Sequence, residues 1–243
     1  MKIVAKTDKG RVRDNNQDAY AVGEFSDEVV WAVVCDGMGG AAGGNIASAL
    51  AVKVISDKIN ASYRDNMRDS SIQNMLDSAL AAANIEVYDF AEANAELKGM
   101  GTTVVCAIVR NNQAFIAHAG DSRAYIIKSD NTSKQVTVDH SYVQDLLASG
   151  RITSEEALIH PKKNIITRAV GVDKSIKVDF DQIDLDEGDT VLLCTDGLSN
   201  YVSDDEMLEI MSDGKHYAFA DRFVTRANDN GGGDNITVVI ISK

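Results

Sequence analysis

An uninterrupted apolar run that ends on an acid constrains this chain more than any other feature. Residues 29–35 are all apolar and rich in β-branched side chains, which is typical of a strand buried on both faces. The run ends at Asp36, and five glycines follow between positions 37 and 44. Because glycine has no side chain, the backbone after this strand can approach a ligand closely. The segment therefore delivers a carboxylate to a loop that is open to a bound group.

Two kinds of site fit this segment. Residues 37–42 match the G-x-G-x-x-A pattern of a dinucleotide-binding turn, and Asp57 lies about 20 residues further on, where an acid could bind a ribose. Alternatively, Asp36 is a metal ligand and the loop carbonyls are further oxygen donors. An acid directly before the first glycine disfavours a pyrophosphate, and the chain lacks the strand–helix alternation of nucleotide-binding folds. The choice depends on whether other carboxylates converge on Asp36.

Composition excludes several function classes. A net charge of −13 disfavours nucleic acid or an anionic membrane as the main partner. The sequence has neither an apolar run of membrane-spanning length nor a signal peptide, so we expect a cytoplasmic protein, and a monomer. With 243 residues, 44% of them hydrophobic, one domain over residues 1–243 is the simplest organisation. Cys35, Cys106 and Cys194 belong to apolar runs, so we expect core thiols in a reducing compartment.

Periodicity predicts blocks of strands interrupted by helices. We expect strands on either side of a polar turn at 7–18, and later at 102–109, 113–119, 122–128, 176–183, 190–194 and 236–242. We expect helices at 44–60, 70–97, 142–148, 154–158, 204–211 and 216–228. In the second helix, Ser70 or Ser71 is the expected cap, and a buried stripe should contain Ile72, Leu76, Ala79, Ala83, Val87 and Phe90. Tight turns between strands predict an α+β fold of packed antiparallel sheets with helices outside.

Acids at the ends of strands form the main functional pattern. Asp36, Asp121, Asp196 and Asp234 each adjoin a glycine and a predicted strand. A desolvated carboxylate needs a partner, and the chain has too few cations to pair them all. Oxygen ligands of this type select Mg²⁺, Mn²⁺ or Ca²⁺. An Asp-Gly pair alone is most often an ordinary turn, as at residues 186–189, but the neighbouring apolar runs set these acids apart.

These residues carry a resemblance to a known family. The chain contains, in order, Arg13-x-x-Asn16-Gln17-Asp18, Asp36-Gly37-Met38-Gly39-Gly40, Gly101-Thr102-Thr103, Gly120-Asp121-Ser122-Arg123, Asp139-His140-Ser141, Asn164 to Gly171, Thr195-Asp196-Gly197-Leu198 and Gly233-Asp234-Asn235. This set resembles the metal-dependent protein phosphatases of the PPM (type-2C) family, in the stand-alone form typical of bacteria. Each motif is short, but eight in register over nearly the whole chain are specific.

The resemblance implies a four-layer α-β-β-α sandwich, two antiparallel sheets flanked by helix pairs, with a flap at about 141–175. It also implies a centre of two Mn²⁺ or Mg²⁺ ions. Asp36 would bridge the ions, Asp196 and Asp234 would hold the first, and the Gly37 carbonyl would hold the second. Asp121 matches the family position of a weaker third ion.

The remaining implied roles concern the substrate. Arg13 would bind the phosphate, Asp18 would lie behind the metal ligands, and His160, on the flap, is a candidate substrate contact. The resemblance implies hydrolysis of phosphoserine and phosphothreonine on proteins by a metal-activated water, reversing a serine/threonine kinase. Two positions depart from the pattern: Gln17 replaces a common Glu, and Met38 replaces a histidine proposed as general acid in eukaryotic members. A binding module without strong catalysis is the alternative, which the retained acids disfavour.

Overall fold

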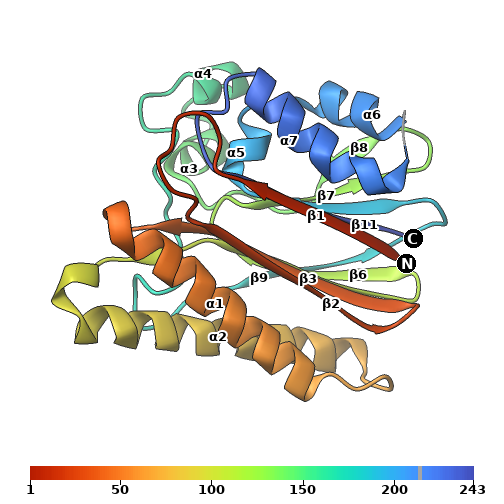
Figure 1. Ribbon diagram of the computed structural model, residues 1–243, viewed down its shortest axis with the longest axis horizontal. Coiled ribbons are helices and arrows are strands. Elements are labelled where there is room, and N and C mark those ends of the chain that lie inside the picture. The colour runs from red at the N-terminus through yellow and green to blue at the C-terminus, as the bar shows by residue number, and fades with distance from the viewer. Residues whose placement is uncertain (213–214) are drawn as a thin grey trace.

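The computed structural model describes residues 1–212 and 215–243 as two sheets covered by helices on both outer faces (Figure 1). One sheet has the order β1 (Lys2–Asp8), β11 (Ile236–Ser242), β10 (Thr190–Cys194), β7 (Arg123–Ile127) and β8 (Ser133–Gln135). The other has the order β2 (Asp18–Ser26), β3 (Val29–Met38), β5 (Val104–Arg110), β6 (Gln113–Ala119) and β9 (Asp179–Asp184), with β4 (Gly101–Thr102) paired to the end of β3. The predicted α+β class is confirmed.

The helices form the two outer layers. Helices α1 (Gly40–Ser62) and α2 (Asp69–Ala93) cover the β2–β9 sheet, and α6 (Asp204–Ser212) and α7 (Phe219–Asp229) cover the other sheet (Figure 1). Short helices α3 (Tyr142–Ala148), α4 (Ser154–Leu158) and α5 (Asp196–Ser199) lie at one end, and the 3₁₀ turns span Ala95–Leu97 and His216–Ala218. No helix in the described part of the chain is long and apolar enough to cross a membrane.

Strand β3 is buried on both faces, as its sequence predicts. Val33 and Cys35 pack toward the α1–α2 layer, whereas Ala32 and Val34 pack between the sheets. A third apolar cluster lies between the β1–β8 sheet and its helices. Successive side chains of a strand point to opposite faces of its sheet, and here both faces are apolar. Three cores therefore form between the four layers.

The β1–β2 and β6–β7 connections pass from one sheet to the other at one end of the sandwich, whereas the β9–β10 connection does so at the opposite end. Strand β6 belongs to one sheet and β7 to the next, although only residues 120–122 separate them. The tight turn between these two strands therefore joins the two sheets rather than two neighbours in one sheet. Gly120 makes this crossing with φ at +115°, a conformation that L side chains rarely adopt. The loop between β1 and β2 crosses in the same way, so segments from both sheets meet at this end.

Several element boundaries differ from the expectation. Helix α1 begins at Gly40 rather than at residue 44, so glycines occupy its first turn. Helix α2 is capped by Arg68 without a side-chain hydrogen bond, so the expected Ser70 or Ser71 cap is wrong. Ala91, not Phe90, continues the buried stripe, and Phe90 is 41% exposed. The helix ends at Ala93, where a 3₁₀ turn replaces its predicted last turn.

Candidate active site

Acids from five strand ends meet at the end of the sandwich where the chain changes sheets. A cleft of about 490 Å³ is lined by Arg13, Gly37 and the acids Asp36, Asp121, Asp196 and Asp234, together with Val12, Asp14, Asn15, Gln17, Met38, Gly39, Gly40, Asn164, Ile166 and Asn235. Asp18 is paired with Asp36 across the β2–β3 ladder. The sequence pattern of strand-end acids thus corresponds to one place in the fold.

Two threonines fix the backbone of Asp36. The Thr102 hydroxyl and the Thr103 amide donate to the Asp36 carbonyl, at 2.8 and 2.9 Å. The Asp36 amide in turn donates to Thr103 Oγ1 at 3.0 Å. Every backbone polar group of Asp36 is therefore satisfied, and its carboxylate is held toward the cleft by a rigid strand end. These contacts explain the Gly101-Thr102-Thr103 motif.

The glycines after two of the acids are required by close packing. A Cβ on Gly37 would lie 2.0 Å from the Gly44 carbonyl oxygen, and a Cβ on Gly197 would lie 1.8 Å from that of Asn235. No side chain fits at either position. The Asp-Gly pairs are thus points where a strand end touches a neighbouring loop, rather than exposed turns.

The acids raise one another's pKa values. Burial first, and then the neighbouring carboxylates led by Asp18, raises the pKa of Asp36 well above its ordinary value. Burial and the charge of Asp234 raise the pKa of Asp196, whose carboxyl lies within hydrogen-bonding reach of Asp36. Burial and Asp196 raise the pKa of Asp121 to about 7. Without a cation, the cluster therefore holds protons at a pH where isolated acids are ionised.

Asp18 lies behind the cleft and holds the two sheets together. Its Oδ2 accepts hydrogen bonds from the hydroxyls of Thr195, at 2.9 Å, and Thr237, at 2.6 Å. Burial, opposed by these hydrogen bonds, raises the pKa of Asp18 to about 7. The Oδ1 atoms of Asp18, Asp121 and Asp196 are buried without a hydrogen-bond partner in the described part of the chain.

These orphaned oxygens test the fit of the site to divalent ions. Buried carboxylate oxygens without donors lack the compensation that buried charges need, and oxygen-only donors suit Mg²⁺ or Mn²⁺. Within residues 1–212 and 215–243, no three His, Cys, Asp or Glu side chains form a ready-made shell around one point. An ion here would therefore keep water ligands, as Mg²⁺ usually does. On that basis the residues fit the implied ions.

Arg13 lies at the mouth of the cleft. Its Nη2 donates to Asp234 Oδ2 at 2.8 Å, and the arginine side chain is 52% exposed. This bond is the first cause that raises the Arg13 pKa, and the charges of Asp36 and Asp196 add to it. The guanidinium therefore faces the acids from the solvent side, where an incoming anion would meet it.

The flap side chains differ in their distance from the cleft. His160 lies outside the cleft lining: its ring centroid is 5.9 Å from that of Tyr142, and its Nδ1 accepts from the Lys162 amide. Its role as a substrate contact stays a prediction. Arg168 donates to Asp179 Oδ1 and contacts His140 Nε2, both at 2.7 Å. Arg168 is therefore held by its own fold, whereas Asn164 and Ile166 reach the cleft.

Asn235 is a positioning residue to which the sequence motifs assign no role. Its Oδ1 accepts from the backbone N–H of Gln17, and its Nδ2 donates to the backbone carbonyls of Lys9 and Asn15. One side chain thus pins both ends of the loop that carries Arg13. Gln17 itself donates from Nε2 to the Gly40 carbonyl at 2.8 Å, a bond that a glutamate could not make. Its place in a motif was the only sequence signal for Asn235.

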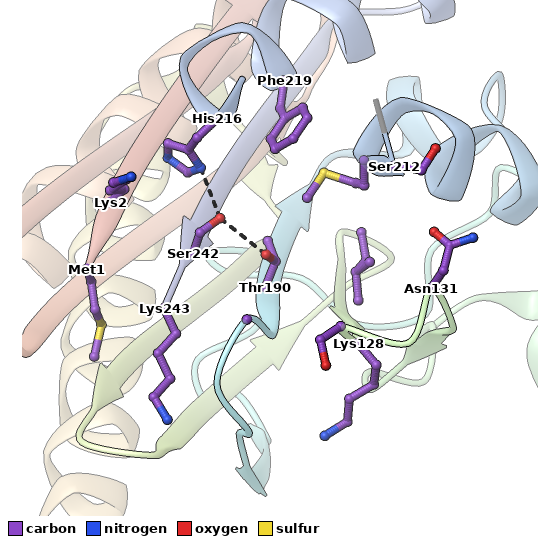
Figure 2. A pocket seen from close by; sticks show the side chains of 14 residues that line it. Met1, Lys2, Lys128, Asn131, Thr190, Ser212, His216, Phe219, Ser242 and Lys243 are labelled. Atoms are coloured by element: carbon purple, nitrogen blue, oxygen red, sulfur yellow. Dashed lines mark hydrogen bonds between the residues drawn. The ribbon is translucent and has the colours of Figure 1, made fainter. Parts of the chain in front are cut away.

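A hollow of about 750 Å³, larger than the acid cleft, lies away from the acids. Figure 2 shows it around the Ser242 hydroxyl, which is hydrogen-bonded to His216 Nδ1 at 2.9 Å and to the Thr190 hydroxyl at 3.2 Å. Thr190 and Ser242 lie at the ends of β10 and β11 remote from Asp196 and Asp234. None of the acids of the cleft lines this hollow, so it is separate from the candidate active site.

The fold disfavours the dinucleotide site. All the strand pairs of the two sheets are antiparallel, so the described residues contain no parallel β-α-β crossover of the kind that binds a pyrophosphate. Asp57, the candidate ribose ligand, is exposed on α1 and paired with Lys53 at 2.8 Å. The glycine loop serves the acid cleft instead.

Comparisons with known proteins agree with this geometry. A family model described as protein phosphatase 2C matches residues 8–236. The serine/threonine phosphatase stp of Listeria innocua is 40% identical over 242 residues, which cover 98% of this chain and 94% of that protein. The crystal structure of Stp1 from Staphylococcus aureus has a TM-score of 0.93 at 37% identity, covering 100% of this chain and 94% of that one. The catalytic domain of PstP in complex with 2 manganese ions has a TM-score of 0.84 at 33% identity, covering 98% and 96%. The chain therefore belongs to the protein phosphatase 2C family and is a protein phosphatase.

Proposed function

We propose that this chain hydrolyses phosphoserine and phosphothreonine on proteins and requires Mn²⁺ or Mg²⁺ to do so. The observation that carries the proposal is the meeting of Asp36, Asp121, Asp196 and Asp234 in one cleft, with buried carboxylate oxygens that lack hydrogen-bond donors. The related PstP catalytic domain, whose structure is a complex with 2 manganese ions, supports the same choice of ion. In this proposal the cluster is a receptor for cations, and the cations make the crowding of the acids tolerable.

Each acid has a proposed role. Asp36 would be shared by two ions, Asp196 and Asp234 would hold the first, the Gly37 carbonyl would hold the second, and Asp121 would hold a weaker third. Divalent ions held in this way activate water and neutralise charge on the phosphoryl oxygens. Asp36 is fixed by the threonine contacts to its backbone, so it can hold its position while the ions bind. Asp18 accepts hydrogen bonds from Thr195, which directly precedes Asp196, and from Thr237, which lies three residues after Asp234. It therefore helps to hold both acids in place.

Arg13 binds the phosphate of the substrate. Its single carboxylate bond, to Asp234, is exposed enough to be exchanged for a phosphate, which its planar fork can bind with two nitrogens. Asp234 would then be free to hold an ion. No histidine lines the cleft in the described part of the chain, and Met38 occupies its wall. The leaving serine or threonine oxygen therefore takes its proton from solvent.

The substrate is a phosphorylated protein, and the enzyme reverses a serine/threonine kinase. Arg13, Lys162 and Lys163 give the acidic chain a positive rim that attracts phosphate; Arg168 contributes less, because it is paired with Asp179. The three cysteines are buried and unpaired, which supports a reducing compartment, and we place the enzyme in the cytoplasm as a monomer.

Hydrolysis of a phosphothreonine peptide tests the proposal. We expect turnover with Mn²⁺, none after EDTA, and a loss of about a thousandfold or more in Asp36→Asn, because electrostatic stabilisation of this kind dominates such reactions. Asp57→Asn is the matched control, since Asp57 is exposed on α1 and remote from the cleft. Activity that persists in EDTA and in Asp36→Asn would place the chemistry elsewhere.

A further inference from the structure

A second groove opens directly from the acid cleft. It has a volume of about 430 Å³ and runs between the flap helices α3 and α4 and the short helix α5. Asp121, Asn164 and Asp196 line both hollows. Anything that occupies the groove therefore lies beside the position where the phosphate would be hydrolysed.

The flap wall of this groove is aliphatic. Val143 and Leu147 are four residues apart on α3 and so present one face, and Ala157 and Leu158 on α4 line the same space. Neither helix contains a fully buried residue. Leu158 is 72% exposed, a large apolar surface left open at the edge of a functional cleft. Exposed aliphatic residues grouped in this way mark binding surfaces.

The arginine that lines the groove, Arg123, is already paired with an acid. Arg123 donates to both oxygens of Asp139, at 2.9 and 2.7 Å, and Gln135 donates to the same carboxylate. The arginine is therefore not available to select an acidic group. Because Asp121 and Asp196 also line the groove, it favours an apolar occupant over an acidic one.

Further exposed aliphatic side chains belong to residues that line the hollows or are next in sequence to such residues. Val12 lines the acid cleft and is 69% exposed. Ile159 follows Leu158 at the end of α4 and is 84% exposed, and Ile165, next to the cleft residues Asn164 and Ile166, is 46% exposed. A flexible phosphopeptide laid across the two hollows would cover aliphatic side chains on both sides of the acids.

We infer that the groove receives an aliphatic side chain of the substrate protein, close in sequence to the phosphorylated residue. The inference rests on the proposed function, and its basis is the continuity of the groove with the acid cleft. The enzyme would thus read the sequence around the phosphate through Leu147 and Leu158, and it would favour leucine, isoleucine or valine at one flanking position.

A peptide scan tests this inference. Phosphothreonine peptides in an alanine background carry a single leucine, and then a single glutamate, at each flanking position in turn. We expect leucine at one position to raise kcat/KM by about tenfold over alanine, the scale of discrimination by an aliphatic pocket. Equal kcat/KM for every peptide would overturn the inference while leaving the proposed function intact. No hydrolysis of any phosphopeptide with Mn²⁺ would instead be a failure of the proposed function.

Leu158→Lys assigns the preference to the groove. Because Leu158 is largely exposed, this change should not unfold the protein. Within the variant, the leucine-to-alanine ratio should fall toward one. Ile85→Lys, an exposed aliphatic position on α2 that lines neither hollow, should keep the wild-type ratio. A leucine preference unchanged in Leu158→Lys would overturn the assignment, and so would a dimer that this variant dissociates.

Discussion

Without divalent ions, the stability of this protein should fall as the pH rises from about 4 to about 7. The reason is the pKa of Asp18 and of Asp121, which burial raises from 3.8 to about 7 in the metal-free fold. A carboxyl with a raised pKa in the folded state binds a proton more tightly there than in the unfolded chain. Its stabilising effect is complete below the unfolded pKa, and it is lost as the pH rises through the folded pKa.

The magnitude follows from these shifts. A shift of roughly 3 units at about 1.4 kcal/mol per unit is worth about 4 kcal/mol for one such acid. For a chain of this size that amount lowers Tm by roughly 10 °C. Thermal unfolding in EDTA between pH 4 and pH 8, repeated with Mn²⁺, measures it. The ions favour ionised carboxylates, so Mn²⁺ should raise Tm far more at pH 8 than at pH 5.

Two variants separate the acid cluster from other titrating groups. Asp18→Asn removes one of the acids, so the decline of Tm with pH in EDTA should become shallower. Asp57→Asn, which changes an exposed acid, should behave like the wild type. A metal-free Tm that stays level or increases from pH 5 to pH 8 would refute the reasoning.

Further predictions concern single contacts. Gly197→Ala should destabilise the fold by about 3 kcal/mol and abolish activity, because its Cβ would meet the Asn235 carbonyl; urea unfolding measures this. Arg13→Lys should raise KM for a phosphopeptide by about tenfold, since a lysine cannot bind phosphate with a planar fork; an unchanged KM would exclude Arg13 from phosphate binding. Arg168 and His140 hydrogen bonds lower the pKa of Asp179 to about 2 against its burial, so its contribution to stability is lost as pH falls from about 4 to about 2. Asp179→Asn should abolish that part of the acid dependence of Tm.

The sequence was sufficient where one local pattern determined the outcome. Strand β3 could be predicted because its apolar run fits a strand with cores on both faces, and the acid that ends it lies where the pattern indicated. The beginning of α1 could not be predicted, because glycine disfavours helices and only tertiary contacts keep it there. The Cβ positions of Gly43 and Gly44 lie against Met100 and Gly37, so these glycines permit close packing.

The site shows the same division. The acids at strand ends could be predicted from the sequence, because each lies beside a recognisable apolar run. The contacts between distant segments could not be predicted: Asn235 contacts residues more than 200 positions away, and the Asp18 carboxylate accepts from the hydroxyl of Thr195, which follows β10, and from that of Thr237 in β11. The pairing of Arg168 with Asp179 was likewise invisible, because nothing local distinguishes a paired arginine from one that faces substrate.

The central claim is that the acids of the cleft form a single receptor for divalent ions, with Asp36 shared between them. Calorimetric titration of the metal-free protein with Mn²⁺ tests this claim most directly. We predict two tightly bound ions per chain in the wild type and in Asp57→Asn, and loss of tight binding at both sites in Asp36→Asn. Unchanged Mn²⁺ binding in Asp36→Asn would contradict the account.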